Sequence, residues 1–370
     1  MNFNNLTYIY QSGRVSRLVK KEEYPQEFFY GLASLKNNFD HTTVIELEEN
    51  KETTFKNYFF YFLRKISGLP IYSEQLIFKD NIKKIKQSDL IVCSNQRMGF
   101  SALPFIFMNK SNKKQISSVF VMGLYNVNTK KQIKILIRKL FTFLFIRTID
   151  KIIFLSEGEY NYSIKKYKNY KNKFVFLPFC IDTKFWNAKN TILNEKKHIL
   201  FMGNDGMRDY NFVIDLARSM PQYNFIFITK NIKNTEIKSE NVKLYNGFWS
   251  EEILSDKDIR EIYKNSIVSI IPINESFQPS GQSVALQSMS MGVPVIITKT
   301  SGFWEPNVYK DGKNILFVNK NDVEIWKNKI LSLLNDENKR LQIIKDARKT
   351  VLENNNLENF NKELNKIFFN

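Results

Sequence analysis

The sequence predicts an α/β fold in which parallel strands are joined by helices. The clearest sign is a β-branched strand, Ile267 to Ile271, followed by a polar loop that contains Gly281. A helical pattern starts at Gln282 and ends at Gly292, and the apolar run Val293 to Thr298 forms a second strand. A strand, a helix and a strand in this order make a βαβ unit, whose crossover requires the two strands to be parallel.

Short apolar runs rich in β-branched residues recur along the whole chain, with helical patterns between them. This alternation extends the α/β prediction to the full sequence. The further runs that we expect to form strands are 6–10, 42–47, 89–93, 118–122, 151–155, 174–178, 198–202, 223–229, 242–244 and 315–318. The expected helices are 24–35, 58–66, 130–149, 258–265, 322–334, 338–353 and 357–369, with two more opening at Ser156 and after Arg208.

Length and charge set the broad class of the protein. The chain has 370 residues, 43% of them hydrophobic, which suggests two domains with large cores. Its 55 Lys and Arg against 37 Asp and Glu give a net charge of +18, which favours an anionic partner such as nucleic acid, a membrane surface or a phosphorylated substrate. The richness in Lys, Asn and Ile also looks like coding bias, so the charge by itself does not choose among them.

Several features favour the cytoplasm. Cys93 and Cys180 are far apart in apolar surroundings, which predicts no disulfide and fits a reducing compartment. The amino terminus lacks the basic region and apolar core of a signal peptide. No run approaches the roughly 20 apolar residues of a spanning helix. We therefore expect a cytoplasmic protein that is at most peripheral to a membrane.

Nucleophilic and metal-based machinery has little support in the sequence. His41 and His198 are the only histidines, and neither lies in a site-like tract. A Ser/His/Asp arrangement or a multi-His metal site is therefore not indicated. The D-x-D segment from Asp256 to Asp258 stands at the start of a predicted helix, where acids cap amide donors, which argues against a metal-dependent site.

Two predicted helices are unusual in composition. The helix 130–149 carries an apolar stripe bracketed by Lys and Arg, and it contains no acidic residue before Asp150. Such a helix is typical of an anchor on anionic lipid, and the alternative is a core helix whose lysines face solvent. The helix 58–66 is aromatic, and we expect it to be part of the core rather than a platform for stacking bases.

Two loops have the composition of phosphate-binding turns. GNDGMR, from Gly203 to Arg208, follows a strand and precedes a helix, as does PSGQS, from Pro279 to Ser283. Free N–H groups at the start of a helix favour an anion such as phosphate. The Arg208 guanidinium could bind phosphate oxygens in a bidentate way, and the alternative is a helix-capping loop with a surface arginine. The sequence has no G-x-G-x-x-G and no P-loop motif.

LQSMSMGVPVI, followed by SGFWE and DGKNILFV, resembles the nucleotide-sugar signature of the retaining GT-B glycosyltransferases of glycosyltransferase family 4. That signature is L-E-A-M-A-x-G-x-P-V-I, then G-G-x-x-E and D-G-x-x-G-x-L-V. The family's acidic motif is Glu, seven residues and Glu. Its second position falls on Gln287 and its first on Pro279, so Glu275 or Gln278 is expected to serve instead.

The resemblance implies a GT-B fold, in which two Rossmann-like domains face a cleft. Residues 1–188 would be the acceptor-binding domain and 189–356 the nucleotide-sugar-binding domain. Residues 357–370 would form a helix that returns to the first domain. PFCIDTKFW resembles the family's turn between domains, and a polar tract at 187–197 is the expected linker.

The resemblance also implies roles for the donor-side residues. Transfer with retention would proceed by front-side displacement, with no protein nucleophile, metal or cofactor, and a UDP- or GDP-sugar as substrate. Arg208 would neutralise the diphosphate, and Glu275 or Gln278 would orient the sugar. Gln287 would bind the ribose through weaker, neutral hydrogen bonds. The donor-binding residues would be Gly203, Asn204, Asp205, Ser280, Gly281, Gln282, Ser283 and Gln287.

Three residues are candidates for the acceptor side. Gly13 follows the first predicted strand and resembles the family's amino-terminal glycine loop, or is an ordinary turn glycine. Arg14 follows it and could face the cleft between domains. Arg97 lies just past a strand end, where acceptors bind in this architecture, or is a solvated arginine.

The favoured function is therefore a glycosyltransferase that builds a cell-envelope polysaccharide or glycan on a saccharide or lipid-linked acceptor. A catalytically silent GT-B scaffold is an alternative, because Gln287 replaces the family's glutamate. A basic nucleic-acid-binding protein is another; charge supports it, but no recognised motif does, and we expect no nucleic-acid partner.

Overall fold

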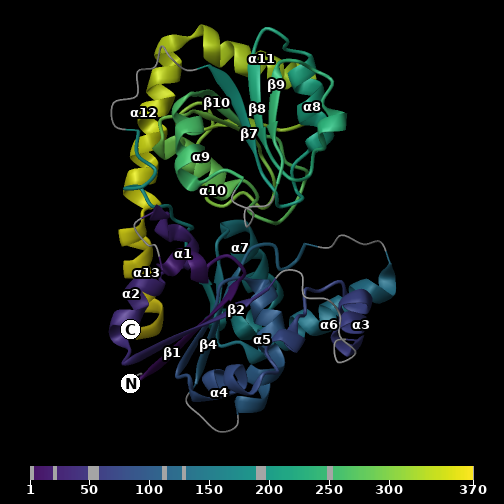
Figure 1. Cartoon of the computed structure of the whole chain (residues 1–370), viewed down its shortest axis with the longest axis vertical. Helices are drawn as coiled ribbons and strands as arrows, with labels where there is room; N and C mark the ends of the chain where they lie inside the picture. The colour runs from purple at the N-terminus through teal and green to yellow at the C-terminus, as the bar shows by residue number, and fades with distance from the viewer. Residues whose placement is uncertain are drawn as a thin grey trace. The chain divides into compact units, whose positions relative to one another are not determined.

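The computed structural model describes residues 4–19, 23–48, 58–110, 115–126, 131–188, 197–247 and 253–369. The chain divides into two compact units (Figure 1). The first contains residues 1–178 together with 361–370, and the second contains residues 179–360. Most of the expected linker, residues 189–196, lies outside the described residues, as does Lys130 of the basic helix.

The first unit is built on a sheet whose described strands all pair in parallel. They are β1 (Asn5–Gln11), β2 (His41–Leu47), β3 (Leu90–Cys93), β4 (Ile116–Val121), β5 (Lys151–Phe154) and β6 (Phe174–Phe176). Their order across the sheet is β2-β1-β3-β4-β5-β6. Each coincides with a run that the sequence predicts as a strand, because buried parallel strands are nearly continuous apolar runs.

Helices cover both faces of this sheet. They are α1 (Val15–Val19), α2 (Leu32–Leu35), α3 (Tyr58–Ser67), α4 (Lys79–Gln87), α5 (Gln96–Asn109), α6 (Gln132–Thr148) and α7 (Glu157–Lys166). Helices α4, α5 and α6 lie on one face and α2 on the other (Figure 1). Helix α13 (Leu357–Phe369) ends in this unit, where the Asn365 amide donates to the Ser34 hydroxyl of α2 over 2.8 Å.

The second unit repeats the plan. Its strands are β7 (His198–Met202), β8 (Asn224–Ile228), β9 (Val242–Tyr245), β10 (Ser266–Ile271), β11 (Val295–Thr298) and β12 (Leu316–Val318). Their order is β12-β11-β10-β7-β8-β9, again with parallel pairing throughout the described strands. The predicted βαβ unit is present as β10, α10 (Gln282–Ser290) and β11.

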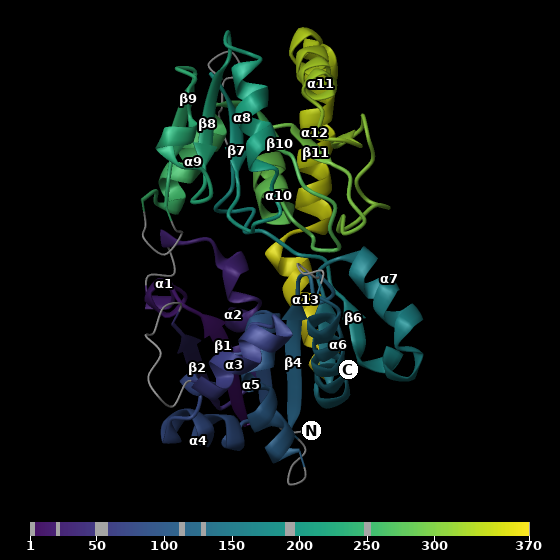
Figure 2. The same ribbon diagram turned by 90° about the vertical axis from the view of Figure 1, so that its right-hand side faces the viewer.

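The remaining helices of the second unit sandwich the sheet. They are α8 (Tyr210–Arg218), α9 (Asp256–Lys264), α11 (Val323–Asn335) and α12 (Glu337–Asn354). Helices α8 and α11 lie on one face, and α9, α10 and α12 on the other (Figures 1 and 2). Within the described parts of the chain, no helix has both the length and the apolar character that a membrane span requires. Both cysteines are buried free thiols, as predicted.

The helix predicted at 24–35 is wrong as a single element. A 3₁₀ turn, Gln26–Phe29, is separated from α2 by Tyr30 and Gly31, whose φ angles are 48° and 79°. The reason is tertiary. The hydroxyl groups of Tyr8 and Tyr10, both in β1, donate to the Tyr30 and Phe29 carbonyls over 2.9 and 2.7 Å. These carbonyls therefore do not need a continuing helix to accept a hydrogen bond.

The sequence analysis did not predict helices α4 and α5. Helix α5 contains Gly99 and Pro104, both of which weaken a helical prediction. Gly99 is needed for close packing, because a Cβ there would lie 2.8 Å from both Phe145 and Val119. Contact with the sheet and with α6 therefore explains a residue that local propensity disfavours.

Candidate active site

The second sheet changes its direction of winding between β7 and β10. These strands are neighbours, but the chain leaves β7 through α8 toward β8 and leaves β10 through α10 toward β11, on opposite sides. The loops that follow them, 203–209 and 272–281, therefore meet at the carboxyl edge of the sheet. In open parallel sheets, ligands bind at such a point.

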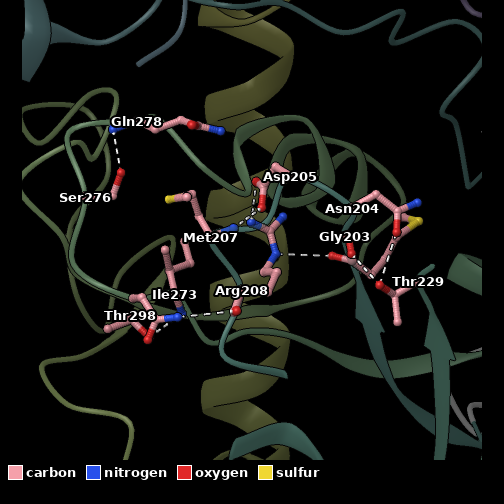
Figure 3. Close-up of polar contacts among 12 residues, drawn as sticks. Gly203, Asn204, Asp205, Met207, Arg208, Thr229, Ile273, Ser276, Gln278 and Thr298 are labelled. Carbon is pink, nitrogen blue, oxygen red and sulfur yellow. Dashed lines mark hydrogen bonds and ion pairs between the residues drawn. The ribbon is translucent and has the colours of Figure 1, made fainter. Parts of the chain in front are cut away.

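Backbone contacts join these two loops. A β-bridge connects Arg208 to Ile273 (Figure 3). The Asn274 N–H also donates to the Met207 carbonyl over 2.9 Å. This pairing fixes the main chain around Arg208 to the loop that leads into α10.

Asn321 reinforces the junction from a distant part of the sequence. Its amide donates to the Ile273 carbonyl over 3.2 Å and to the Asp209 carboxylate over 3.1 Å. The Thr298 hydroxyl donates to the Asn321 oxygen over 2.6 Å and accepts from the Ile273 N–H over 3.0 Å. No local motif in the sequence reveals this network, because its members come from four separate loops or strand ends.

Arg208 lies almost entirely out of solvent. Its residue exposure is 3%, so the surface-arginine alternative is wrong. The guanidinium Nη1 donates to the Asp205 carboxylate over 2.7 Å (Figure 3). Its Nε donates to the Met202 carbonyl over 3.4 Å. A guanidinium has five N–H donors, so these contacts leave further donors for an anion.

Gly203 makes room for this arrangement. A Cβ at this position would lie 2.6 Å from the Arg208 Nε, which is closer than side-chain atoms tolerate. The Gly203 carbonyl accepts from the Thr229 hydroxyl over 2.8 Å, and the Asn204 side-chain oxygen accepts from the Lys230 N–H over 2.7 Å. The end of β8 therefore supports the shape of the loop.

The second predicted cradle is the start of α10. Gly281 precedes the helix with φ 82°, and a Cβ there would lie 2.6 Å from Ile271. The N–H groups of a helix's first turn have no partner within the helix, and the N-cap residue here, Gly281, has no side chain that could cap them. Among the described residues, the buried Ser280 hydroxyl also has no hydrogen-bond partner. Gln282 is buried in this turn and Ser283 is partly exposed.

Gln287 lies further along α10, beyond its first turn, with 5% of its surface exposed. The buried Tyr263 hydroxyl of α9 donates to its side-chain oxygen over 3.1 Å. This contact fixes the amide and its orientation. The sequence analysis missed Tyr263, since an apolar helical stripe gives no sign that a tyrosine in it will reach an amide on another helix.

Glu275 and Gln278 belong to the loop before α10. The Glu275 carboxylate is exposed and accepts from the Ser301 N–H over 2.9 Å. The Gln278 N–H donates to the Ser276 hydroxyl over 2.9 Å, and Figure 3 shows the Gln278 side chain extending away from that contact. Gly302 approaches so closely that a Cβ there would lie 2.4 Å from the Phe277 carbonyl carbon. The SGFWE segment therefore supports this loop.

The acceptor-side candidates lie in the first unit. Gly13 has φ 85° in the loop after β1, and the Arg14 guanidinium carbon stands 5.6 Å from the centroid of the Phe28 ring. Burial lowers the pKa of Arg14. In α5, the Arg97 guanidinium carbon lies 4.0 Å from the centroid of the Tyr72 ring, and its buried Nε has no hydrogen-bond partner among the described residues.

The D-x-D segment is a helix cap, as predicted. The Ser255 hydroxyl accepts from the Asp258 N–H over 3.1 Å, and the Asp258 carboxylate accepts from the Ser255 N–H over 2.9 Å. His198 contacts the Ser266 hydroxyl over 3.0 Å inside the second unit. The described residues bring together no group of three or more His, Cys, Asp or Glu side chains that could hold a metal ion.

Comparison with known families identifies the domain that carries the two loops. Residues 182–350 match the model of the family described as glycosyl transferases group 1. This range falls within the second unit and contains Arg208, α10 and Gln287. The second unit therefore contains the region that is similar to group 1 glycosyltransferases.

A curated relative supports this glycosyltransferase assignment. The uncharacterized glycosyltransferase MJ1178 of Methanocaldococcus jannaschii is 29% identical over 191 residues, which cover 47% of this chain. The match spans about half of that relative, 49% of its length.

Solved structures match across both units. Alr3699/HepE of Anabaena, in complex with UDP and glucose, is 12% identical with a TM-score of 0.68, and 98% of each chain is covered. The sucrose-phosphate synthase of Thermosynechococcus elongatus is 13% identical with a TM-score of 0.68, covering 99% of this chain and 98% of that one. At such identities the likeness establishes the fold, and the predicted GT-B class is confirmed.

Proposed function

We propose that this chain transfers a sugar from a nucleotide-sugar donor, a UDP- or GDP-sugar, to a saccharide or lipid-linked acceptor. The observation that carries the proposal is the buried Arg208 guanidinium, held by Asp205 in a loop paired with the loop that opens α10. A charge kept out of water, in a loop paired with the loop that leads to a helix N-terminus, favours an anionic ligand.

In the proposed reaction, the bond between the sugar's anomeric carbon and the diphosphate breaks, and the acceptor hydroxyl forms a bond to the same face of that carbon. The acceptor proton passes to a diphosphate oxygen, so no protein nucleophile is required. Arg208 and the N–H groups of α10 stabilise the charge that develops on the leaving diphosphate. Asp205 holds the guanidinium in position before the donor arrives. These groups would replace a metal ion, which makes the proposed transferase metal-independent and retaining.

The other donor-side residues take complementary roles in this proposal. Gln287, fixed by Tyr263, would contact the ribose, and the Ser280 hydroxyl would bind a phosphate oxygen. Glu275 or Gln278 would orient the transferred sugar from the loop that SGFWE supports. Gly13, Arg14 and Arg97 would serve the acceptor, with residues 1–188 as the acceptor domain.

We propose further that the enzyme works in the cytoplasm, on cell-envelope polysaccharide or glycan, at the surface of an anionic membrane. Two proteins of similar fold have been solved with nucleotide bound. HepE is in complex with UDP and glucose, and TarM of S. aureus is in complex with α-GlcNAc-glycerol and UDP. These likenesses support a nucleotide-sugar donor but do not select the acceptor.

Melting curves with nucleoside diphosphates test the donor site. At about 100 times the dissociation constant a ligand stabilises by roughly 2.7 kcal/mol, a shift of a few degrees for a domain of this size. UDP or GDP is expected to produce that shift, with ADP as the comparison. No shift with any of the three would contradict the proposal.

Gln287 in place of the family's glutamate keeps a silent scaffold as the second candidate. Incubation with a panel of sugar nucleotides and acceptors separates the two. A transferase releases free nucleoside diphosphate and forms a glycosylated product, whereas a scaffold binds the nucleotide and releases none.

A further inference from the structure

The first unit carries an apolar surface that the core does not use. Helix α3 was expected to be part of the core, and this is wrong for most of it, because four of its five aromatic side chains are exposed. They are Tyr58, Phe59, Tyr61 and Phe62, at 47–63% exposure. A soluble protein that presents contiguous aromatic side chains to water usually uses them for binding.

Helix α6 adds a second apolar strip. Its buried side chains, such as Phe145 and Ile146, face the sheet, so the core alternative holds for that face only. The opposite face exposes Ile133, Leu136, Leu140, Phe143 and Leu144, with Ile133 at 76% and Leu136 at 69%. The spacing of these residues places them along one side of the helix.

The two helices lie against each other (Figures 1 and 2). The contact is fixed at the end of α3, where the Arg138 guanidinium donates to the Gly68 carbonyl over 3.1 Å. Lys134 packs on the same glycine, since a Cβ there would lie 2.6 Å from its Cε. Two cations of α6 thus stand at the negative end of the α3 dipole and join the two helices that carry the exposed apolar side chains. We call it the α3–α6 surface.

Charge on this surface has a single sign. The described residues of α3 and α6 include no Asp or Glu. Lys65, Lys139 and Arg147 are exposed, and none has an acidic partner among the described residues. Apolar side chains flanked by unpaired cations match the two requirements of a helix that lies in the interface of an anionic bilayer.

We propose that the α3–α6 surface docks on an anionic lipid bilayer, with the apolar side chains entering the acyl boundary and the cations meeting lipid phosphates. The inference deepens the proposed function, on which it rests, by placing the membrane contact on two helices rather than one. A second copy of the chain fits the surface poorly. A two-fold contact would bring Lys65, Lys139 and Arg147 against the same positive surface of the partner, with no acid to compensate.

Co-sedimentation of the full chain with vesicles tests this docking. Binding is expected on phosphatidylcholine mixed with phosphatidylglycerol, with much less on phosphatidylcholine alone, and added salt should weaken it. Leu140→Asp should lower the partition coefficient by about tenfold or more, because it removes an exposed leucine that would enter the bilayer and adds a charge that anionic lipid repels. The matched control is Leu352→Asp on α12, another exposed leucine on a helix, which should bind like the unaltered chain.

A charge variant probes the second requirement. Lys139→Gln combined with Arg147→Gln should lower the partition coefficient about fivefold for each cation removed. Lys345→Gln with Lys349→Gln, exposed on α12, is the control. Melting curves establish that each variant is folded.

Three results would overturn the docking proposal: no binding of the unaltered chain to anionic vesicles, equal binding of the Leu140→Asp chain, or a dimer in light scattering that Leu140→Asp dissociates. The UDP or GDP shift is measured on the same samples. A chain that binds nucleotide but not vesicles refutes the surface alone, and one that binds vesicles but no nucleotide refutes the donor site alone.

Discussion

Arg208 and Asp205 form an ion pair 2.7 Å long in which the arginine side chain is 2% exposed and the aspartate 26%. Arg218 and Asp215 have the same spacing in sequence and pair over 3.0 Å, but both side chains are more than half exposed. The surroundings of the two pairs therefore differ while the local chemistry is the same, and the second pair is a matched control for the first.

Arg208→Ala should remove most of the thermal shift that UDP or GDP produces. Hydrogen bonds from a charged donor contribute about 1.5–3 kcal/mol, so nucleotide binding should weaken by roughly ten- to a hundredfold. Arg218→Ala should leave both the shift and the affinity unchanged. Titration calorimetry measures the affinities, and full retention of binding by Arg208→Ala would remove that residue from the donor site.

Gly203→Ala should weaken nucleotide binding because a new Cβ, 2.6 Å from the Arg208 Nε, displaces the guanidinium. Gly206 provides the comparison. It has φ 76° and nothing within 4 Å of a built Cβ, so Gly206→Ala should cost roughly 1 kcal/mol of stability through backbone strain alone. Calorimetry with UDP or GDP distinguishes them. Equal affinities for the two variants would show that the position of the guanidinium does not matter.

Tyr263→Phe should raise the dissociation constant for the nucleotide, because the Gln287 amide loses the hydroxyl that orients it. The unfolding free energy should also fall by about 1 kcal/mol. Tyr8→Phe in the first unit removes a comparable buried hydroxyl, which donates to the Tyr30 carbonyl over 2.9 Å. It should lower stability by a similar amount without changing nucleotide affinity. If both variants bind nucleotide like the unaltered chain, Gln287 does not need Tyr263.

Glu159 should make stability depend on pH. This residue lies in α7 and is fully buried. Burial raises its pKa from 4.5 to about 7, although the Gly123 N–H, just past β4, donates to its carboxylate over 2.7 Å. Because the folded pKa is the higher one, the stabilisation is complete below pH 4.5 and is lost as pH rises to about 7. The loss is at most about 3 kcal/mol.

Glu159→Gln, which carries no titrating proton, should flatten this dependence. Denaturant unfolding between pH 5 and pH 8 provides the measurement, with Glu157→Gln, a partly exposed neighbour on the same helix, as control. A slope that is unchanged by Glu159→Gln would assign the pH dependence to other groups.

Local sequence was sufficient for the strands and for the positions of the two loops. Buried parallel strands are apolar throughout, so β7 and β10 stand out against their polar surroundings. A glycine-bearing loop between such a strand and a helix lies at the carboxyl edge of the sheet by geometry alone. The predicted βαβ unit and the D-x-D helix cap follow from the same local rules, and both are present.

Side-chain environments required the tertiary structure. The sequence allows Arg208 to be a surface residue. In the folded chain, the loop after β10 pairs with the loop that carries Arg208, and the arginine is buried. Tyr263 reaches Gln287 across 24 residues, and Asn321 reaches Asp209 across 112. Helix α3, aromatic enough to suggest a core helix, lies against α6 with most of its rings in water. Periodicity specifies which face of an element is apolar, but burial depends on which distant segments pack against that face, and only the folded chain determines this.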